Sequence, residues 1–289
     1  MSRRIPHWLP SLDGIDRAQD HLLALVFLRD LAHDAFTVTA PPDACWERIA
    51  ALPDEHLGRA LQAACDACAT AWGEAIEGFF DGVDFERVDP ATLRRGVRSV
   101  TALRPHKHGA HFGPRTHLGD VYEATRGLAV AQRQGAFFTP YTVASLLARV
   151  MGLGPWTSVL DPACGAGVML IAALDALREE QGERVAATLK LVGVEIDPRT
   201  AAVARASLVL AGAHPDQFWI ATGDGLEQEI VGRDRSDGKL KSLAFHFNLA
   251  NPPFGRGFVH DRGPVARQPL LLPERVHYHE HPPQTARAA

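Results

Sequence analysis

Apolar side chains recur every three or four residues through the first hundred positions of the chain, which is the spacing of amphipathic helices. Residues 15–36 and 56–80 show this spacing best, with charged side chains between the apolar ones. The recurring positions are Leu22, Leu25, Val26, Leu28, Leu57, Leu61, Ala64, Cys68, Ala71 and Ala75. We expect two or three packed helices here, with Trp72, Phe79 and Phe80 in their core.

Residues 103–117 interrupt this pattern with a stretch rich in proline, glycine and histidine. This composition is typical of a loop, and we place a domain boundary in it, so that residues 1–117 form an N-terminal helical domain with its loop. The histidines of the loop lack paired cysteines or carboxylates, which favours a solvated loop over a metal site. They are His106, His108, His111 and His117. Cys65 and Cys68 lie in an alanine-rich helical stretch, and we expect them to be buried thiols.

The pattern changes from Leu118 onward, where short apolar runs alternate with helical stretches. Residues 135–152 predict an aromatic turn followed by a helix. Thr139 suits the N-cap of that helix and Pro140 suits its first position. The helix carries one apolar stripe, formed by Val143, Leu146, Leu147 and Val150.

Four predicted strands follow, in residues 157–167, 189–197, 217–225 and 243–255. Helices are predicted between the first three, over 168–180 and 198–212, the second capped by Asp197 and ended by Gly212. This alternation predicts an α/β fold with a parallel sheet and right-handed crossovers. We assign residues 118–262 to this Rossmann-like domain and residues 263–289 to an irregular or disordered tail.

The composition limits the possible partners. The net charge is −4, whereas a protein that contacts many DNA phosphates is usually basic, so any contact with DNA uses a local patch or another protein. No apolar run reaches the roughly 20 residues that span a bilayer, and the N-terminus lacks the apolar stretch of a secretory signal. Four cysteines are too few for a disulfide framework in a chain of this size. We expect reduced thiols, a cytoplasmic location and no membrane partner.

The predicted strands end in residues that can bind a ligand. Ligands of an open parallel sheet bind outside the carboxyl ends of its strands, so Asp161, Glu195, Asp224 and Asn251 should lie along one rim. The turn DPACGAG after the first strand lets a ligand approach the backbone closely, and a helix follows it. A carboxylate at Glu195 typically accepts hydrogen bonds from ribose hydroxyls. These features predict a site for an adenosine-type cofactor, with a dinucleotide still possible.

The sequence NPPF after the fourth strand predicts a rigid turn at the same rim, because proline cannot donate to a sheet. The Asn251 side chain and the Pro252 carbonyl would be two fixed acceptors, which suit an amino group with two hydrogens. Phe254 supplies a flat face beside them, which suits a planar base that has left the DNA stack. The alternative is a turn that only ends the strand.

The order of FTP, DPACGAG, VGVEID, TGDGL and NPPFG resembles the N6-adenine DNA methyltransferases. The chain is most similar to the modification (methylase) subunits of type I restriction–modification systems and to related short methylases. Residues 117–140 resemble the linker before the catalytic domain of those subunits, and LALVFLRDLAHD resembles their N-terminal helical domain. The likeness is strongest over residues 118–256.

The resemblance implies S-adenosylmethionine as methyl donor and an adenine flipped out of DNA as acceptor. It also implies a role for each matching residue. Phe138, Thr139 and Pro140 would flank the methionine end of the cofactor, and Asp161, Ala163, Gly165 and Gly167 would form its binding turn. Glu195 would hold the ribose and Asp224 the adenine amino group, with Ile196 and Leu226 packing on the adenine ring. Asn251, Pro252, Pro253 and Phe254 would be the catalytic set. No metal is required.

Two other functions fit parts of the pattern. A protein glutamine methyltransferase also uses an Asn-Pro-Pro-aromatic turn, although the FTP turn and DPACGAG favour DNA. A non-catalytic or truncated methylase-fold subunit, acting with a partner, fits residues 256–289, which offer only the short apolar run PLLLP for the further strands of a complete sheet. DNA recognition would then depend on a separate specificity subunit.

Overall fold

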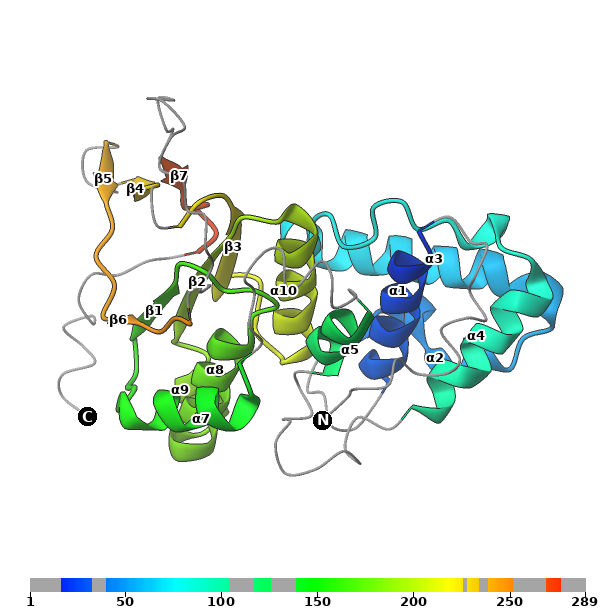
Figure 1. The fold of residues 1–289 in the computed structure, drawn as a ribbon, viewed down its shortest axis with the longest axis horizontal. Coiled ribbons are helices and arrows are strands. Elements are labelled where there is room, and N and C mark those ends of the chain that lie inside the picture. Colours follow the sequence, from blue (N-terminus) through cyan, green and yellow to red (C-terminus); the bar gives the residue numbers. More distant parts are fainter. Residues whose placement is uncertain are drawn as a thin grey trace.

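The computed structural model describes residues 17–32, 40–103, 117–125, 139–225, 228–233, 239–251 and 269–276. Helices from the first part of the chain lie beside a region built on a parallel sheet (Figure 1). The predicted α/β class, with a helical N-terminal region, is therefore confirmed.

The helical region is built around α1 (Ala18–Leu31), whose residues from Leu22 to Leu28 are fully buried. The other helices are α2 (Trp46–Ala50), α3 (Asp54–Trp72) and α4 (Pro90–Ala102), with 3₁₀ turns η2 (Pro42–Ala44), η3 (Gly73–Ile76) and η4 (Phe85–Arg87). Phe27 of α1 packs against three aromatic rings, those of Trp72, Phe79 and Phe80. The predicted aromatic core is thus confirmed.

Cys65 and Cys68 are buried on α3, as predicted. Loss of solvation raises the pKa of both thiols, that of Cys68 to about 12, so both remain protonated. Their chemistry is that of small apolar side chains in a helical core.

Helix α5 (His117–Thr125) joins the two regions, and it corrects the prediction for one loop histidine. His117 is not solvated: its Nδ1 lies 2.8 Å from the Asp30 carboxylate, and Asp30 also pairs with Arg29 at 2.8 Å. A buried carboxylate requires such partners, which the local composition could not reveal. His106, His108 and His111 lie outside the described residues.

The main sheet has the order β3-β2-β1-β6, with all neighbours parallel. Its strands are β1 (Ser158–Asp161), β2 (Lys190–Glu195), β3 (Phe218–Thr222) and β6 (Phe247–Asn248). All four predicted strands are present. Because they are parallel, their carboxyl ends share one edge, which we call the rim.

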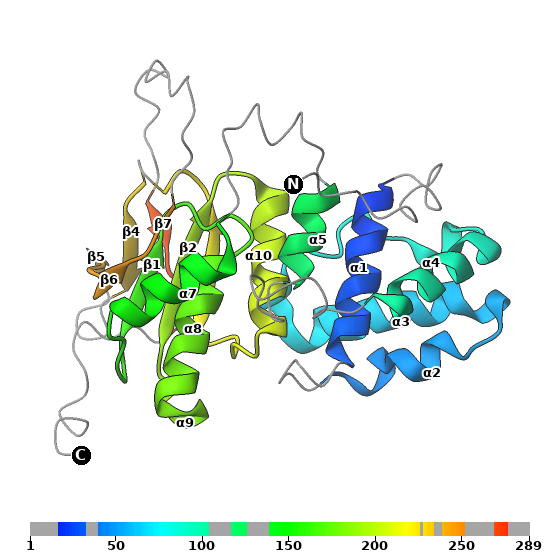
Figure 2. The same cartoon turned by 60° about the horizontal axis from the view of Figure 1, so that its bottom comes forward.

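Helices α8 (Val168–Gln181) and α10 (Pro198–Leu210) connect the strands, with a short α9 (Glu183–Ala186). In both views α10 lies between the sheet and the helices α1 and α5 (Figures 1 and 2). Because α10 has neighbours on both of these sides, most of its residues are buried. Its sequence is accordingly rich in alanine and has no polar face. Within the described ranges, the structure contains no helix whose length and hydropathy would suit a bilayer span.

Helix α7 (Tyr141–Val150) packs on α8, and its buried face is the one with the alanines. Ala144 and Ala148 are buried, whereas the apolar stripe is exposed, with Leu146 at 62% and Val150 at 77%. The small alanines allow the two helices to approach closely, so this face fits against α8 better than the larger side chains would. The apolar stripe noted in the sequence is therefore not the packed face of α7.

A second, small sheet has the order β5-β4-β7 and was not predicted. Its strands are β4 (Ile230–Arg233), β5 (Leu240–Ser242) and β7 (Leu270–Leu271). The Asp-Gly pair between the first two was a hairpin signal in the sequence. Strand β7 lies in the predicted irregular tail, and here the structure differs from the prediction because Leu272 and Val276 are buried against the main sheet.

Candidate active site

The turn after β1 has two glycines in the left-handed conformation, Gly165 (φ 54°) and Gly167 (φ 89°). The amide of Cys164, between them and β1, donates to the Val194 carbonyl at 2.9 Å and fixes the turn on β2. A Cβ atom added at Gly165 would meet no atom of the described residues within 4 Å. The turn therefore presents its backbone to an open position just before α8 begins.

Asp161 ends β1 and is almost fully buried. Loss of solvation raises the pKa of its carboxyl to about 7, and the nearby Glu195 charge adds to this. The Ala163 amide, which donates to Asp161 at 3.0 Å, acts in the opposite direction. Asp161 therefore holds the turn through its hydrogen bond with the Ala163 amide. With a pKa of about 7, its carboxyl is protonated in about half of the molecules near neutral pH.

Glu195 ends β2, and each of its carboxylate oxygens accepts a backbone hydrogen bond. The Gly165 amide donates to Oε2 and the Asp197 amide to Oε1, both at 3.0 Å. The carboxylate thus ties the glycine turn to the end of the next strand. Each oxygen of a carboxylate can accept a second hydrogen bond, as a ribose hydroxyl would require. The neighbouring Ile196 is 66% exposed and offers an apolar surface at the rim.

The segment after β3 reaches the same turn. A Cβ atom added at Gly225 would collide with the Pro162 carbonyl oxygen, so only glycine allows this approach. Asp224, one residue earlier, donates its amide to the Gln228 side chain at 2.7 Å. The ends of β1, β2 and β3 therefore converge on one place.

Asn251, which follows β6, is held by Thr139 from before α7. The Asn251 Nδ2 donates to the Thr139 hydroxyl at 2.8 Å, and Thr139 is buried. Thr139 was predicted as the N-cap of the helix, but the N-cap is Pro140, whose ψ of 135° is not helical. The Thr139 hydroxyl instead accepts a hydrogen bond from Asn251, which lies 112 residues later in the sequence. This hydrogen bond fixes the Asn251 amide, so that Oδ1 is its remaining acceptor.

Several predicted site residues lie outside the described residues, namely Phe138, Leu226, Pro252, Pro253 and Phe254. Those that the structure does describe gather at the rim in two groups, one at the glycine turn and one at Asn251. Across the described ranges, no three His, Cys, Asp or Glu side chains form a group that could hold a metal ion. The contact that sequence reasoning missed is the one between Asn251 and Thr139, for which no local pattern exists.

The model of the family described as N-6 DNA Methylase matches residues 114–279. The "Type I restriction enzyme MjaVII methylase subunit" of Methanocaldococcus jannaschii is 28% identical over 139 residues, covering 47% of this chain and 22% of that protein. The "Type II methyltransferase M.MamI" of Microbacterium ammoniaphilum is 34% identical over 170 residues, covering 54% and 42%. The chain therefore spans less than half the length of these relatives.

Among solved structures, the chain is similar to the type I restriction-modification system methyltransferase subunit from Streptococcus thermophilus. The TM-score is 0.47 with 19% sequence identity, over 86% of this chain and 62% of that one.

Proposed function

Because the chain belongs to the N-6 DNA Methylase family, we propose that it binds S-adenosylmethionine at the rim and methylates the N6 amino group of adenine in DNA. The observation that carries the proposal is the clamp of Glu195 on the amide of Gly165, beside an open position at the glycine turn. That arrangement suits a nucleoside whose ribose lies on the carboxylate and whose tail crosses the turn.

The described residues fit this cofactor. Gly165 leaves room for it, Glu195 offers acceptors to the ribose hydroxyls, and the exposed Ile196 offers a surface for the adenine ring. We call this group the cofactor end of the rim. By the family pattern Asp161, Ala163 and Gly167 shape the turn, Asp224 accepts from the adenine amino group, Leu226 packs on the ring, and Phe138, Thr139 and Pro140 flank the methionine end.

The acceptor chemistry falls to the turn at Asn251, which with Thr139 we call the target end of the rim. When bound, S-adenosylmethionine supplies a methyl group that its sulfonium has already activated. The difficulty is the adenine amine, whose lone pair is delocalised into the ring. Asn251 Oδ1 would accept a hydrogen bond from that amine and shift electron density back to its nitrogen. The hydrogen bond to Thr139 holds the amide in advance, so its dipole needs no reorganisation.

The remaining catalytic residues are proposed from the family pattern. The Pro252 carbonyl would be the second acceptor for the amine, Pro253 would stiffen the turn, and Phe254 would stack on the flipped base. Catalysis would then consist mainly of positioning and preorganised polarity.

We propose that a partner protein helps this chain to bind DNA. A net charge of −4 gives the chain no general attraction to phosphates, and the relatives include proteins named as methylase subunits. We propose that a separate specificity subunit selects the DNA sequence.

The test is transfer of a radiolabelled methyl group to DNA, with the product identified as N6-methyladenine after digestion. We expect Asn251→Ala to lower transfer by about a hundredfold or more, as loss of a key preorganised polar group does. Asn248→Ala is the matched control, because Asn248 is exposed on β6 three residues earlier and should leave transfer unchanged.

The other outcomes are equally informative. If the wild type is inert on DNA with a specificity subunit present but methylates a protein glutamine, the acceptor is wrong and the glutamine methyltransferase alternative holds. Cofactor binding without transfer to either acceptor would indicate a non-catalytic subunit.

A further inference from the structure

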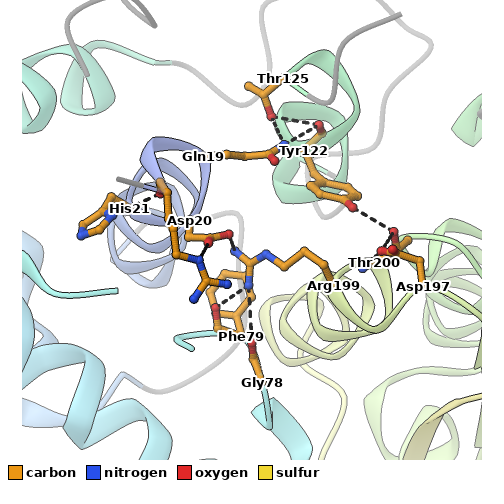
Figure 3. A network of polar contacts seen from close by, with 11 residues as sticks. Gln19, Asp20, His21, Gly78, Phe79, Tyr122, Thr125, Asp197, Arg199 and Thr200 are labelled. Carbon is orange, nitrogen blue, oxygen red and sulfur yellow. Dashed lines mark hydrogen bonds and ion pairs between the residues drawn. The ribbon is translucent and has the colours of Figure 1, made fainter. Parts of the chain in front are cut away.

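The first turn of α10 is held from the helical side of the molecule by two separate side-chain contacts (Figure 3). The Arg199 guanidinium pairs with Asp20 of α1 at 2.7 Å and donates to the Phe79 carbonyl, also at 2.7 Å. One residue further on, the Thr200 hydroxyl lies 2.8 Å from the Tyr122 hydroxyl of α5. Residues from α1, from the segment after η3 and from α5 thus meet on a single turn of the sheet region.

The hydrogen bonds at Thr200 run in a definite direction. Its hydroxyl and its amide both donate to Asp197 Oδ1 at 2.7 Å, and a hydroxyl has only one proton to donate. The single proton of the Thr200 hydroxyl is therefore used on Asp197, so the Tyr122 hydroxyl must be the donor to Thr200. The result is a chain in which Tyr122 donates to Thr200 and Thr200 donates to Asp197.

This chain ends at the cofactor end of the rim. Asp197, which receives it through its side chain, donates its own backbone amide to Glu195 Oε1 at 3.0 Å. The orientation of the Glu195 carboxylate therefore depends on where the backbone of residue 197 is held. The other carboxylate oxygen is already fixed by Gly165, so a shift at Asp197 would turn the carboxylate away from a ribose.

The position of α5 strengthens this link. Tyr122 and Thr200 are 3% and 2% exposed, so their hydrogen bond lies away from water, where it is strong and its loss is costly. Gly119, on the same helix, lies against the glycine turn: an added Cβ would be 3.1 Å from the Ala166 Cβ. Gln19 of α1 donates to the Thr125 hydroxyl at 2.7 Å and ties α5 to the helical region. One helix thus contacts both sides of the cofactor end.

We propose that Tyr122 is a positioning residue for cofactor binding, which acts through Thr200 and Asp197 on the Glu195 carboxylate. This inference rests on the proposed binding of S-adenosylmethionine at Glu195. It makes the contact between the helical region and α10 part of the cofactor site, although no atom of the helical region needs to touch the cofactor. By linkage, bound cofactor also strengthens that contact.

Calorimetric titration of the full chain with S-adenosylmethionine tests this. Tyr122→Phe removes only the hydroxyl, and we expect roughly three- to tenfold weaker binding, the range for one buried hydrogen bond. Tyr141→Phe is the matched control: it removes a tyrosine hydroxyl that donates to the Asp175 carboxylate at 2.8 Å, away from Asp197, and should bind as the wild type does. Thermal unfolding of both variants establishes that each is folded.

Variants of Thr200 provide a second, independent readout. Thr200→Ser keeps the hydroxyl and should retain wild-type affinity, whereas Thr200→Val breaks the chain and should weaken binding at least as much as Tyr122→Phe. If the chain acts as a unit, adding Tyr122→Phe to Thr200→Val should weaken binding no further.

The contrary results are distinct. Wild-type affinity in folded Tyr122→Phe, or effects of Tyr122→Phe and Thr200→Val that simply add, would overturn the inference and leave the proposed function standing. A wild type that does not bind the cofactor would overturn both.

Discussion

The cofactor end and the target end of the rim lie on the same sheet but are held in different ways. The cofactor end lies at β1 and β2, each of which pairs with a strand on both sides. The target end follows β6, which in the described residues pairs only with β1, over Phe247 and Asn248. Glu195 accepts two backbone hydrogen bonds, whereas Asn251 depends on one side-chain hydrogen bond to Thr139.

The difference indicates which substitutions should impair cofactor binding and which should impair methyl transfer. The cofactor end is supported by the buried interior, so changes there affect stability and cofactor binding together. The target end is attached through a hydrogen bond between two segments far apart in sequence, so a change at Asn251 should affect methyl transfer and leave cofactor binding unchanged. Substitutions can therefore separate the two ends.

The largest expected effect comes from the buried carboxyl beneath the cofactor end. Because the pKa of Asp161 is raised from 3.8 to about 7, the folded state favours the neutral form. The stability it contributes is fully present below about pH 4 and is lost as the pH rises through about 7. At roughly 1.4 kcal/mol per pKa unit, the loss is at most about 4 kcal/mol.

Asp161→Asn tests this, because asparagine stays neutral. We expect the unfolding free energy of the variant, measured by urea titration relative to the wild type, to rise between about pH 4 and pH 7 and then level off. The same pH dependence in both proteins would mean that folding does not raise the pKa of Asp161, contrary to its burial.

The next effect concerns Glu195, which holds the cofactor end together. Glu195→Gln replaces one carboxylate oxygen with an NH₂ group, which cannot accept a hydrogen bond. The two oxygens of Glu195 accept from the Gly165 and Asp197 amides, so the variant must lose one of these hydrogen bonds. Hydrogen bonds to charged groups contribute about 1.5 to 3 kcal/mol, so we expect S-adenosylmethionine to bind about a hundredfold more weakly. Glu179→Gln, on the exposed end of α8, is the control and should bind normally. Equal binding by both variants would remove Glu195 from the site.

A smaller effect is expected at the target end. Thr139→Val removes the hydroxyl that holds the Asn251 amide while keeping the shape of the side chain. We expect roughly tenfold slower methyl transfer, the equivalent of one hydrogen bond, with little change in cofactor affinity. Thr139→Ser keeps the hydroxyl and should restore most of the rate. If Thr139→Val instead weakens cofactor binding and leaves transfer at saturating cofactor unaffected, Thr139 acts only beside the methionine end of the cofactor and does not position Asn251.

Much of the cofactor end could be predicted from the sequence because its determinants are local. The glycine turn follows β1 directly, Glu195 ends β2, and Asp197 caps α10 with a hydrogen bond to the Thr200 amide. Short-range patterns of this kind fix the strand ends, and the topology of a parallel sheet then brings those ends together.

The remainder depended on contacts that no local pattern encodes. The apolar stripe of α7 was visible, but periodicity does not say which face meets a neighbour, and the alanine face fits α8 more closely. The hydrogen bond between Thr139 and Asn251 and the ion pair between Arg199 and Asp20 join segments more than 100 residues apart. Only the folded chain shows that the helical region reaches the cofactor end.

The most direct test of the account is a calorimetric titration of the wild-type chain with S-adenosylmethionine, beside Glu195→Gln and Asn251→Ala. We predict one binding site in the wild type, much weaker binding in Glu195→Gln and unchanged binding in Asn251→Ala. Absence of binding by the folded wild type at millimolar cofactor would contradict the account.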